Sequence, residues 1–221
     1  MKTALYLIPI LAVMVFFLIR AEFRQNQRQI YSLKPLTTLL VIAIAGLSFS
    51  VTPMNPTYTW GILIGLTLSL GGDIALMFPT NQKAFRLGLG LFLLAHVAYA
   101  VTFTLLAGLQ FHWLAAAALV AIGYGLYARL RNGLGAMQGP VIGYLIIISV
   151  MVYQALATFE GGVFSVYQAW LVFCGAGSFY LSDVILAVAR FWKPFQYHRI
   201  SLAFYYTGQL LIALAASYFN P

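Results

Sequence analysis

The chain alternates between long apolar stretches and short polar segments along its whole length. Eight apolar stretches reach or approach the roughly 20 residues that a helix needs to cross a bilayer, namely Thr3–Ile19, Pro35–Val51, Tyr58–Phe78, Leu87–Leu106, Phe111–Ala128, Met137–Phe159, Val163–Ala189 and Ile200–Phe219. This pattern predicts an all-α fold, a polytopic membrane helical bundle with eight transmembrane helices. Because every polar segment is short, we expect a single integral membrane domain over residues 1–221.

Composition excludes an ordinary soluble domain. Hydrophobic residues make up 62% of the chain and charged residues 7%, whereas soluble domains contain about 25% charged residues. Mean hydropathy is +0.91. The net charge of +8 comes from basic residues in short segments between apolar stretches. We therefore interpret this charge as a signal of membrane orientation and expect neither a nucleic-acid partner nor an obligate protein partner.

The basic residues follow a strict alternation. All lysines and arginines except Lys2 lie in the segments after the first, third, fifth and seventh apolar stretches. These residues are Arg20, Arg24, Arg28, Lys34, Lys83, Arg86, Arg129, Arg131, Arg190, Lys193 and Arg199. Cytoplasmic loops carry an excess of lysine and arginine. The alternation therefore predicts both termini on the non-cytoplasmic side of a bacterial inner or plasma membrane.

The third and seventh stretches resemble each other. Each contains a small residue, then an aspartate, Asp73 or Asp183, and then an aliphatic run. A basic segment and another apolar stretch follow in both cases. This similarity favours a parallel duplication of four-helix halves, residues 1–108 and 109–221, whose equivalent helices face each other across a central cavity.

The four acidic residues fall into two groups. Glu22 and Glu160 lie in polar segments, and we expect both to be solvated. Asp73 and Asp183 lie inside apolar stretches, each roughly 9–11 Å from the cytoplasmic end at 1.5 Å per residue. An aspartate there costs about 2.5–3.5 kcal/mol on insertion scales, so such residues face a bundle interior or a water-filled cavity.

Two carboxylates at one depth allow three interpretations. Placed close together in a low dielectric, they cannot both ionise easily and would share a proton, which supplies an acid and a base for hydrolysis. The same pair can bind and release protons in a transporter. Each aspartate can also form an interhelical hydrogen bond with a purely structural role. The pattern alone does not separate these.

Other polar positions give weaker signals. His96 lies within the fourth stretch, as a core histidine or as part of the site. No histidine or cysteine pair has metal-ligand spacing, so no metal site is expected. The pairs Gly61-x-x-x-Gly65 and Gly139-x-x-x-Gly143 favour close helix packing.

A family resemblance rests on six short motifs in a fixed order. They are Lys34-Pro35, Gly72-Asp73, Phe92 with His96 and Tyr99, Tyr144 with Met151 and Ala155, Ser182-Asp183, and Tyr206-x-x-Gln209. With these motifs the chain resembles the YhhN family of eight-span membrane proteins, whose characterised members are lysoplasmalogenases. The resemblance implies hydrolysis of the vinyl ether bond of lysoplasmalogens to a fatty aldehyde and a glycerophospho-ethanolamine or -choline. It implies no metal or organic cofactor, and it implies a lysophospholipid substrate and surrounding membrane lipids as partners.

The resemblance and the carboxylate pattern together assign roles to residues. We expect Asp73 and Asp183 to be catalytic, one as the acid and one as the base. The expected substrate-binding residues are Lys34, His96, Tyr99, Ser182, Tyr206 and Gln209. Lys34 has two alternative roles, since it can hold the substrate phosphate or mark the cytoplasmic side.

We expect both aspartates to reach one amphipathic pocket that opens toward the cytoplasmic leaflet. Its apolar slot would take the alkenyl chain. Its polar mouth, near Lys34, Arg86 and Arg199, would take the phosphate head group.

The alternative function is that of a proton-coupled transporter or lipid carrier that uses the same two carboxylates. Transport of a water-soluble substrate needs a polar path to both faces, and the outer halves of the stretches are mostly apolar, which favours the enzyme. An intramembrane aspartyl protease is not supported, because Leu70 and Ser182 break the two motifs of that class.

Overall fold

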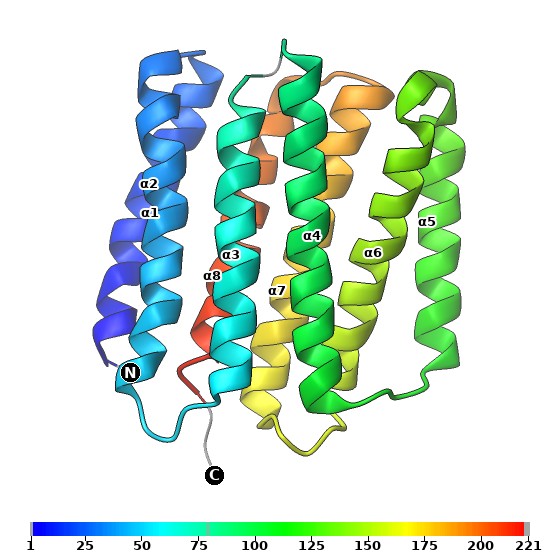
Figure 1. Ribbon diagram of the computed structural model, residues 1–221. Coiled ribbons are helices and arrows are strands. Elements are labelled where there is room, and N and C mark those ends of the chain that lie inside the picture. Colours follow the sequence, from blue (N-terminus) through cyan, green and yellow to red (C-terminus); the bar gives the residue numbers. More distant parts are fainter. Residues whose placement is uncertain (1, 79, 219–221) are drawn as a thin grey trace.

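The computed structural model describes residues 2–78 and 80–218, which form a bundle of upright helices (Figure 1). Within these ranges the α-helices are α1 Lys2–Phe23, α2 Gln27–Gly46, α3 Pro56–Leu76, α4 Gln82–Ala107, α5 Trp113–Leu134, α6 Gln138–Ala157, α7 Val166–Phe191 and α8 Ser201–Ala215. Short 3₁₀ turns follow α2, join α5 to α6 and precede α8. No strand occurs in the described ranges. The all-α prediction is confirmed.

Each predicted stretch corresponds to one helix, with boundary differences that matter at α2. We expected Pro35 to open this helix, and that expectation is wrong. The helix begins at Gln27, where the Asn26 side chain accepts a hydrogen bond from the backbone N–H of Gln29 at 3.3 Å. An asparagine cap satisfies a backbone donor at a helix start. Phe219, the expected end of the eighth stretch, lies outside the described residues, as does Pro79, which follows the third stretch.

Six continuous helical segments among the described residues are long and apolar enough to span a membrane. One of them, Trp113–Ala157, contains both α5 and α6. Helix α8 has 15 described residues, which extend about 22 Å at 1.5 Å per residue. The fold is therefore that of a multi-pass membrane protein. The count of eight spans and the duplication of two halves remain predictions.

The helices alternate in direction, so the basic segments gather at one end of the bundle (Figure 1). We call this the basic end: it holds the α1–α2, α3–α4, α5–α6 and α7–α8 connections. The start of α1 and the end of α8 lie together at the opposite end.

Close packing of α3 against α4 depends on glycine. A Cβ atom at Gly61 would lie 2.0 Å from Thr102 Oγ1, and one at Gly65 would lie 2.2 Å from the Tyr99 ring. Small residues let membrane helices approach closely, so this part of the glycine prediction is confirmed. It is wrong for Gly139 and Gly143, where a Cβ would meet nothing within 4 Å.

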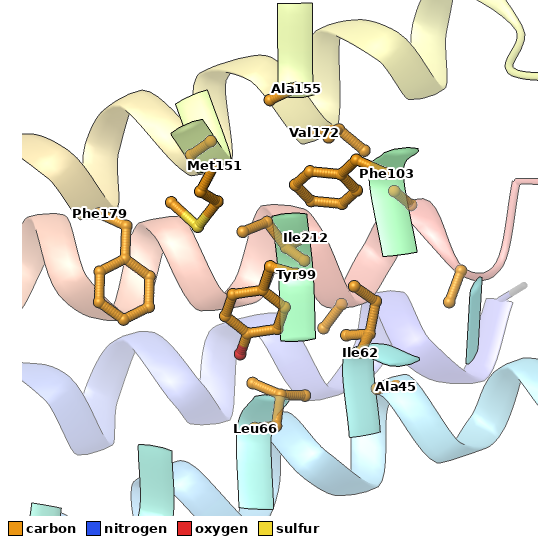
Figure 2. Close-up of a cluster of buried hydrophobic side chains, with 14 of the residues drawn as sticks. Ala45, Ile62, Leu66, Tyr99, Phe103, Met151, Ala155, Val172, Phe179 and Ile212 are labelled. Carbon is orange, nitrogen blue, oxygen red and sulfur yellow. The ribbon is translucent and has the colours of Figure 1, made fainter. Parts of the chain in front are cut away.

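The core lies in the middle of the bundle and is apolar. Figure 2 shows Tyr99 of α4 among Leu66, Met151, Phe179 and Ile212 from four other helices. All five side chains are fully buried. This cluster joins five helices of the bundle.

Candidate active site

Asp73 is the centre of a cage formed by three helices. Its carboxyl group is buried, and its Oδ2 atom accepts hydrogen bonds from the hydroxyl groups of Thr38 and Tyr205, each at 2.6 Å. The Lys34 ammonium lies 3.4 Å from Oδ1. Thr38 and Lys34 share one face of α2 because they are four residues apart. A buried carboxylate needs such partners, since an unpaired charge is costly in an apolar interior.

Lys34 occupies a different place from the one expected. It lies inside α2, 8% exposed, because that helix starts earlier than the apolar pattern indicated. Its ammonium is directed to Asp73, so the structure shows it neither as a free phosphate ligand nor as a loop residue. We therefore interpret Lys34 as the counter-ion of Asp73.

Tyr206 and Gln209 support this cage from behind. The Tyr206 hydroxyl donates to the backbone carbonyl of Lys34 at 3.1 Å. The Gln209 amide donates to the Tyr205 hydroxyl at 2.8 Å, and Tyr205 in turn donates to Asp73. Tyr206 and Gln209, which we expected to bind substrate, thus contact Lys34 and Tyr205, the residues that contact the Asp73 carboxylate.

Asp183 on α7 has a separate set of partners. The Tyr144 hydroxyl on α6 donates to its Oδ2 atom at 2.5 Å. His96 Nε2 on α4 lies 3.7 Å from the same oxygen. The Asp183 side chain is 18% exposed. Among the described residues no hydrogen bond joins Asp183 to Asp73, so each carboxylate has its own environment.

His96 lies beside the Asp183 carboxylate, whereas Tyr99 lies in the apolar core. The His96 ring is fully buried, contacts Tyr144 and Phe179 edge-on, and points one nitrogen at Asp183. His96 therefore lies next to Asp183, in the wall behind the cavity lining. Tyr99 lies one turn further along α4, packed in the apolar core (Figure 2).

Both aspartates line one cavity of about 420 Å³. Lys34 and Ser182, two expected substrate-binding residues, also line it, whereas His96, Tyr99, Tyr206 and Gln209 are not among its lining residues. Most of the remaining wall is apolar, and its apolar members are Leu76, Phe85, Leu89, Phe92, Val141, Leu145, Ile148, Val184, Leu186, Ala187, Ala189, Phe191, Pro194 and Leu202. Tyr144, Tyr180, Tyr205, His198 and Ser201 also line it. An apolar wall with a few convergent polar groups is typical of ligand sites.

Charged groups gather where the cavity approaches the basic end. Arg199 Nη1 lies 2.7 Å from Glu22 Oε2, and both side chains line the cavity. Arg190 also lines it, with its guanidinium 4.8 Å from the Phe85 ring centre. Arg86, which we expected at the mouth, is not among the lining residues. The expectation that Glu22 is freely solvated is wrong, because α1 continues to Phe23 and carries it to Arg199.

Three residues of this site, namely Thr38, Tyr144 and Tyr205, were not among the expected catalytic and substrate-binding residues. Thr38 lies one turn after Lys34, and Tyr205 lies one turn before Gln209. Each therefore shares a helix face with an expected site residue, and this spacing could have indicated both. Tyr144 belongs to a motif of the family resemblance, but nothing local connects it to Asp183, which is 39 residues away.

Within the described residues, no group of three or more histidine, cysteine, aspartate or glutamate side chains is placed to hold a metal ion. The polar groups of the cavity include two carboxylates, one with an ammonium partner and one with a phenol and an imidazole. These features define a multi-pass helical membrane protein with two acidic side chains on an amphipathic cavity.

The YhhN family model matches residues 29–216, and the chain belongs to the YhhN family. It is 27% identical over 195 residues to YhhN, an uncharacterised membrane protein, of Escherichia coli O157:H7 and of Shigella flexneri, covering 87% of this chain and 89% of each relative. It is 31% identical over 161 residues to the rat lysoplasmalogenase TMEM86B, covering 72% of this chain and 63% of that relative. No solved structure matches the chain.

Proposed function

We propose that this protein is a lysoplasmalogenase, which hydrolyses the vinyl ether bond of a lysoplasmalogen to a fatty aldehyde and a glycerophospho-ethanolamine or -choline. The observation that carries the proposal is the position of Asp73 and Asp183 on one largely apolar cavity with cationic groups at its mouth. The similarity to a lysoplasmalogenase supports this substrate class.

The two environments suggest different roles for the carboxyl groups. Asp73 has the Lys34 ammonium as a counter-charge, which favours an anionic role. Asp183 has a phenol and an imidazole as partners, and among the described residues no lysine or arginine pairs with it. We assign Asp183 as the proton donor and Asp73 as the anion, because pairs of acids in unlike environments commonly divide the roles this way.

Hydrolysis then proceeds in three balanced steps. Asp183 transfers its proton to the vinyl carbon β to the ether oxygen, and an oxocarbenium ion forms beside the Asp73 carboxylate. Water adds to the cationic carbon while Asp73 accepts one of its protons, which gives a hemiacetal. Asp183 then takes the hemiacetal hydroxyl proton, Asp73 returns its proton to the leaving glyceryl oxygen, and aldehyde and alcohol separate. Both carboxyl groups end in their starting state.

The cavity mouth fits a phosphate head group better than a free polar solute. Arg190 and Arg199 supply guanidinium groups, which suit phosphate oxygens because they donate in a planar fork. The apolar wall beyond them suits an alkenyl chain. A transporter for water-soluble solutes would need a continuous polar path from the cavity to the opposite end, which the buried apolar cluster containing Tyr99 and Phe103 does not favour (Figure 2).

The test is aldehyde release by purified protein from a lysoplasmalogen. The wild type should release aldehyde, and Asp73→Asn and Asp183→Asn should each lose at least about 10²–10⁴-fold in kcat, the usual contribution of a general acid or base. Glu160→Gln is the matched control, because this acid is largely exposed and lies away from the cavity. Normal cleavage by either asparagine variant would refute the mechanism, and no cleavage by the wild type would refute the function.

A further inference from the structure

A second cavity, of about 560 Å³, lies between α5 and α6. Its walls come from α5 residues between Ala116 and Tyr127 and from α6 residues between Ile142 and Tyr153. The Tyr153 hydroxyl is occupied by backbone groups of the α4–α5 connection, donating to the Gln110 carbonyl. The groove therefore presents almost entirely carbon to whatever occupies it.

The groove exists because α5 packs on the bundle at one end only. This helix buries Leu126, Leu130 and Leu134, all near its basic end, against residues of α6 and α7. Its first half is mostly exposed, with Val120 at 71% and Tyr124 at 72%. In Figure 1, α5 stands at the edge of the bundle beside α6. Because α5 is packed closely only near its basic end, an apolar groove remains between its first half and α6.

One side chain connects this groove to the candidate active site. Leu145 lines both cavities, and its neighbour Tyr144 holds Asp183. We propose that the α5–α6 groove binds the hydrocarbon chain of the substrate, which passes Leu145 while the head group stays at the basic mouth. This inference rests on the proposed function and adds a chain-binding site to it.

The dimensions of the groove agree with one lipid chain. The α6 residues from Ile142 to Tyr153 extend about 17 Å at 1.5 Å per residue. Half of the roughly 30 Å hydrocarbon core, the depth that one chain occupies, is about 15 Å. The groove also starts near Tyr144, the partner of Asp183, and runs along α6 toward the opposite end. A lipid whose cleavable bond lies next to its head group would therefore have its chain in this direction.

Selectivity for the chain must come from shape. Lipid tails are as apolar as leucine, so moving a chain from the bilayer into the groove has little hydrophobic driving force, and van der Waals packing decides the preference. Filling the groove should therefore reduce the use of long chains and leave short chains unaffected. This difference separates a chain site from a general structural role.

Two glycines on α5 provide the experiment. A Cβ at either Gly123 or Gly125 would meet nothing within 4 Å, but only Gly123 lines the groove. Gly123→Phe should lower kcat/KM for a hexadecenyl lysoplasmalogen about tenfold, within the range for hydrophobic pockets, and leave a butenyl analogue unchanged. Gly125→Phe should behave as wild type with both. An equal loss on both chain lengths, or no loss, would overturn the proposal.

A binding measurement separates this proposal from the proposed function. A hexadecyl ether lysophospholipid has no vinyl ether to cleave, and its binding should raise the Tm of the wild type and of Gly125→Phe. Gly123→Phe should lose that shift. If the wild type cleaves no vinyl ether but shows this pattern, the reaction is wrong and the groove stands. If Gly123→Phe instead abolishes a dimer and keeps wild-type chain selectivity, the groove belongs to a second copy and the proposal fails.

Discussion

The Lys34 ammonium and the Asp73 carboxylate form an ion pair of 3.4 Å between α2 and α3, with side chains 10% and 2% exposed. A buried ion pair adds little to stability compared with well-packed apolar residues of similar volume. The loss of one partner, however, leaves an uncompensated charge in the interior. The pair therefore ties the stability of the bundle to the charge of its candidate catalytic group.

Lys34→Met should consequently destabilise the protein by about 3 kcal/mol, because Asp73 loses its counter-charge in an apolar interior. Adding Asp73→Asn to this variant should restore part of that stability, since no buried charge remains. Thermal or denaturant unfolding in detergent gives both values. Asp73→Asn alone completes the cycle, and a double variant that loses as much stability as the two single variants together would show that the two side chains are not coupled.

Tyr144→Phe removes the phenol that donates to Asp183 without changing the shape of the ring. The phenol stabilises the carboxylate that Asp183 becomes as it transfers its proton. A hydrogen bond to a charged group is worth about 1.5–3 kcal/mol, so kcat for vinyl ether cleavage should fall roughly tenfold or more. KM should change little, because the phenol acts through Asp183. Tyr6→Phe, at an exposed position, is the control. A change confined to KM would instead place Tyr144 in substrate binding.

The Glu22–Arg199 ion pair predicts that replacing one or the other charged side chain with uncharged glutamine shifts KM in opposite directions. Arg199→Gln should raise KM about fivefold, because the mouth loses a guanidinium that can bind phosphate, and the effect is limited by the partial exposure of this side chain. Glu22→Gln should lower KM, since the carboxylate no longer competes with phosphate for Arg199. Arg86→Gln is a control at the same end of the bundle, outside the cavity lining. Steady-state kinetics of the three variants measure these changes in KM. Equal effects of Arg199→Gln and Arg86→Gln would contradict a phosphate-binding role for Arg199.

The predicted orientation can be tested with single cysteines. In a Cys174→Ser background, since Cys174 is exposed, a membrane-impermeant maleimide added to intact cells should label Leu109→Cys and spare Thr80→Cys. Thr80 lies in the α3–α4 connection at the basic end, and Leu109 lies in the α4–α5 connection at the opposite end. Lysis should make both positions reactive. Labelling of Thr80→Cys alone in intact cells would reverse the orientation and move the cavity mouth to the outer leaflet.

Local sequence determined the helices and their order. A span must satisfy its own backbone and present apolar side chains to lipid, so the apolar stretches located every helix from α1 to α8. The cost of an intramembrane charge likewise identified Asp73 and Asp183 as interior residues. The largest boundary error is at the start of α2, because the polar residues from Gln27 to Lys34 belong to a helix that extends past its apolar part. Helices α1 and α5 likewise continue past their apolar stretches, to Phe23 and Leu134.

Only the tertiary structure decided which groups surround each aspartate. Tyr205 reaches Asp73 across 132 residues and Tyr144 reaches Asp183 across 39. Such pairings depend on how each helix is rotated about its axis and how closely its neighbours approach, which hydropathy does not encode. The same reason applies to Lys34, which the charge pattern places at the basic end. Its burial against Asp73 follows from the packing of α2 beside α3 and α8.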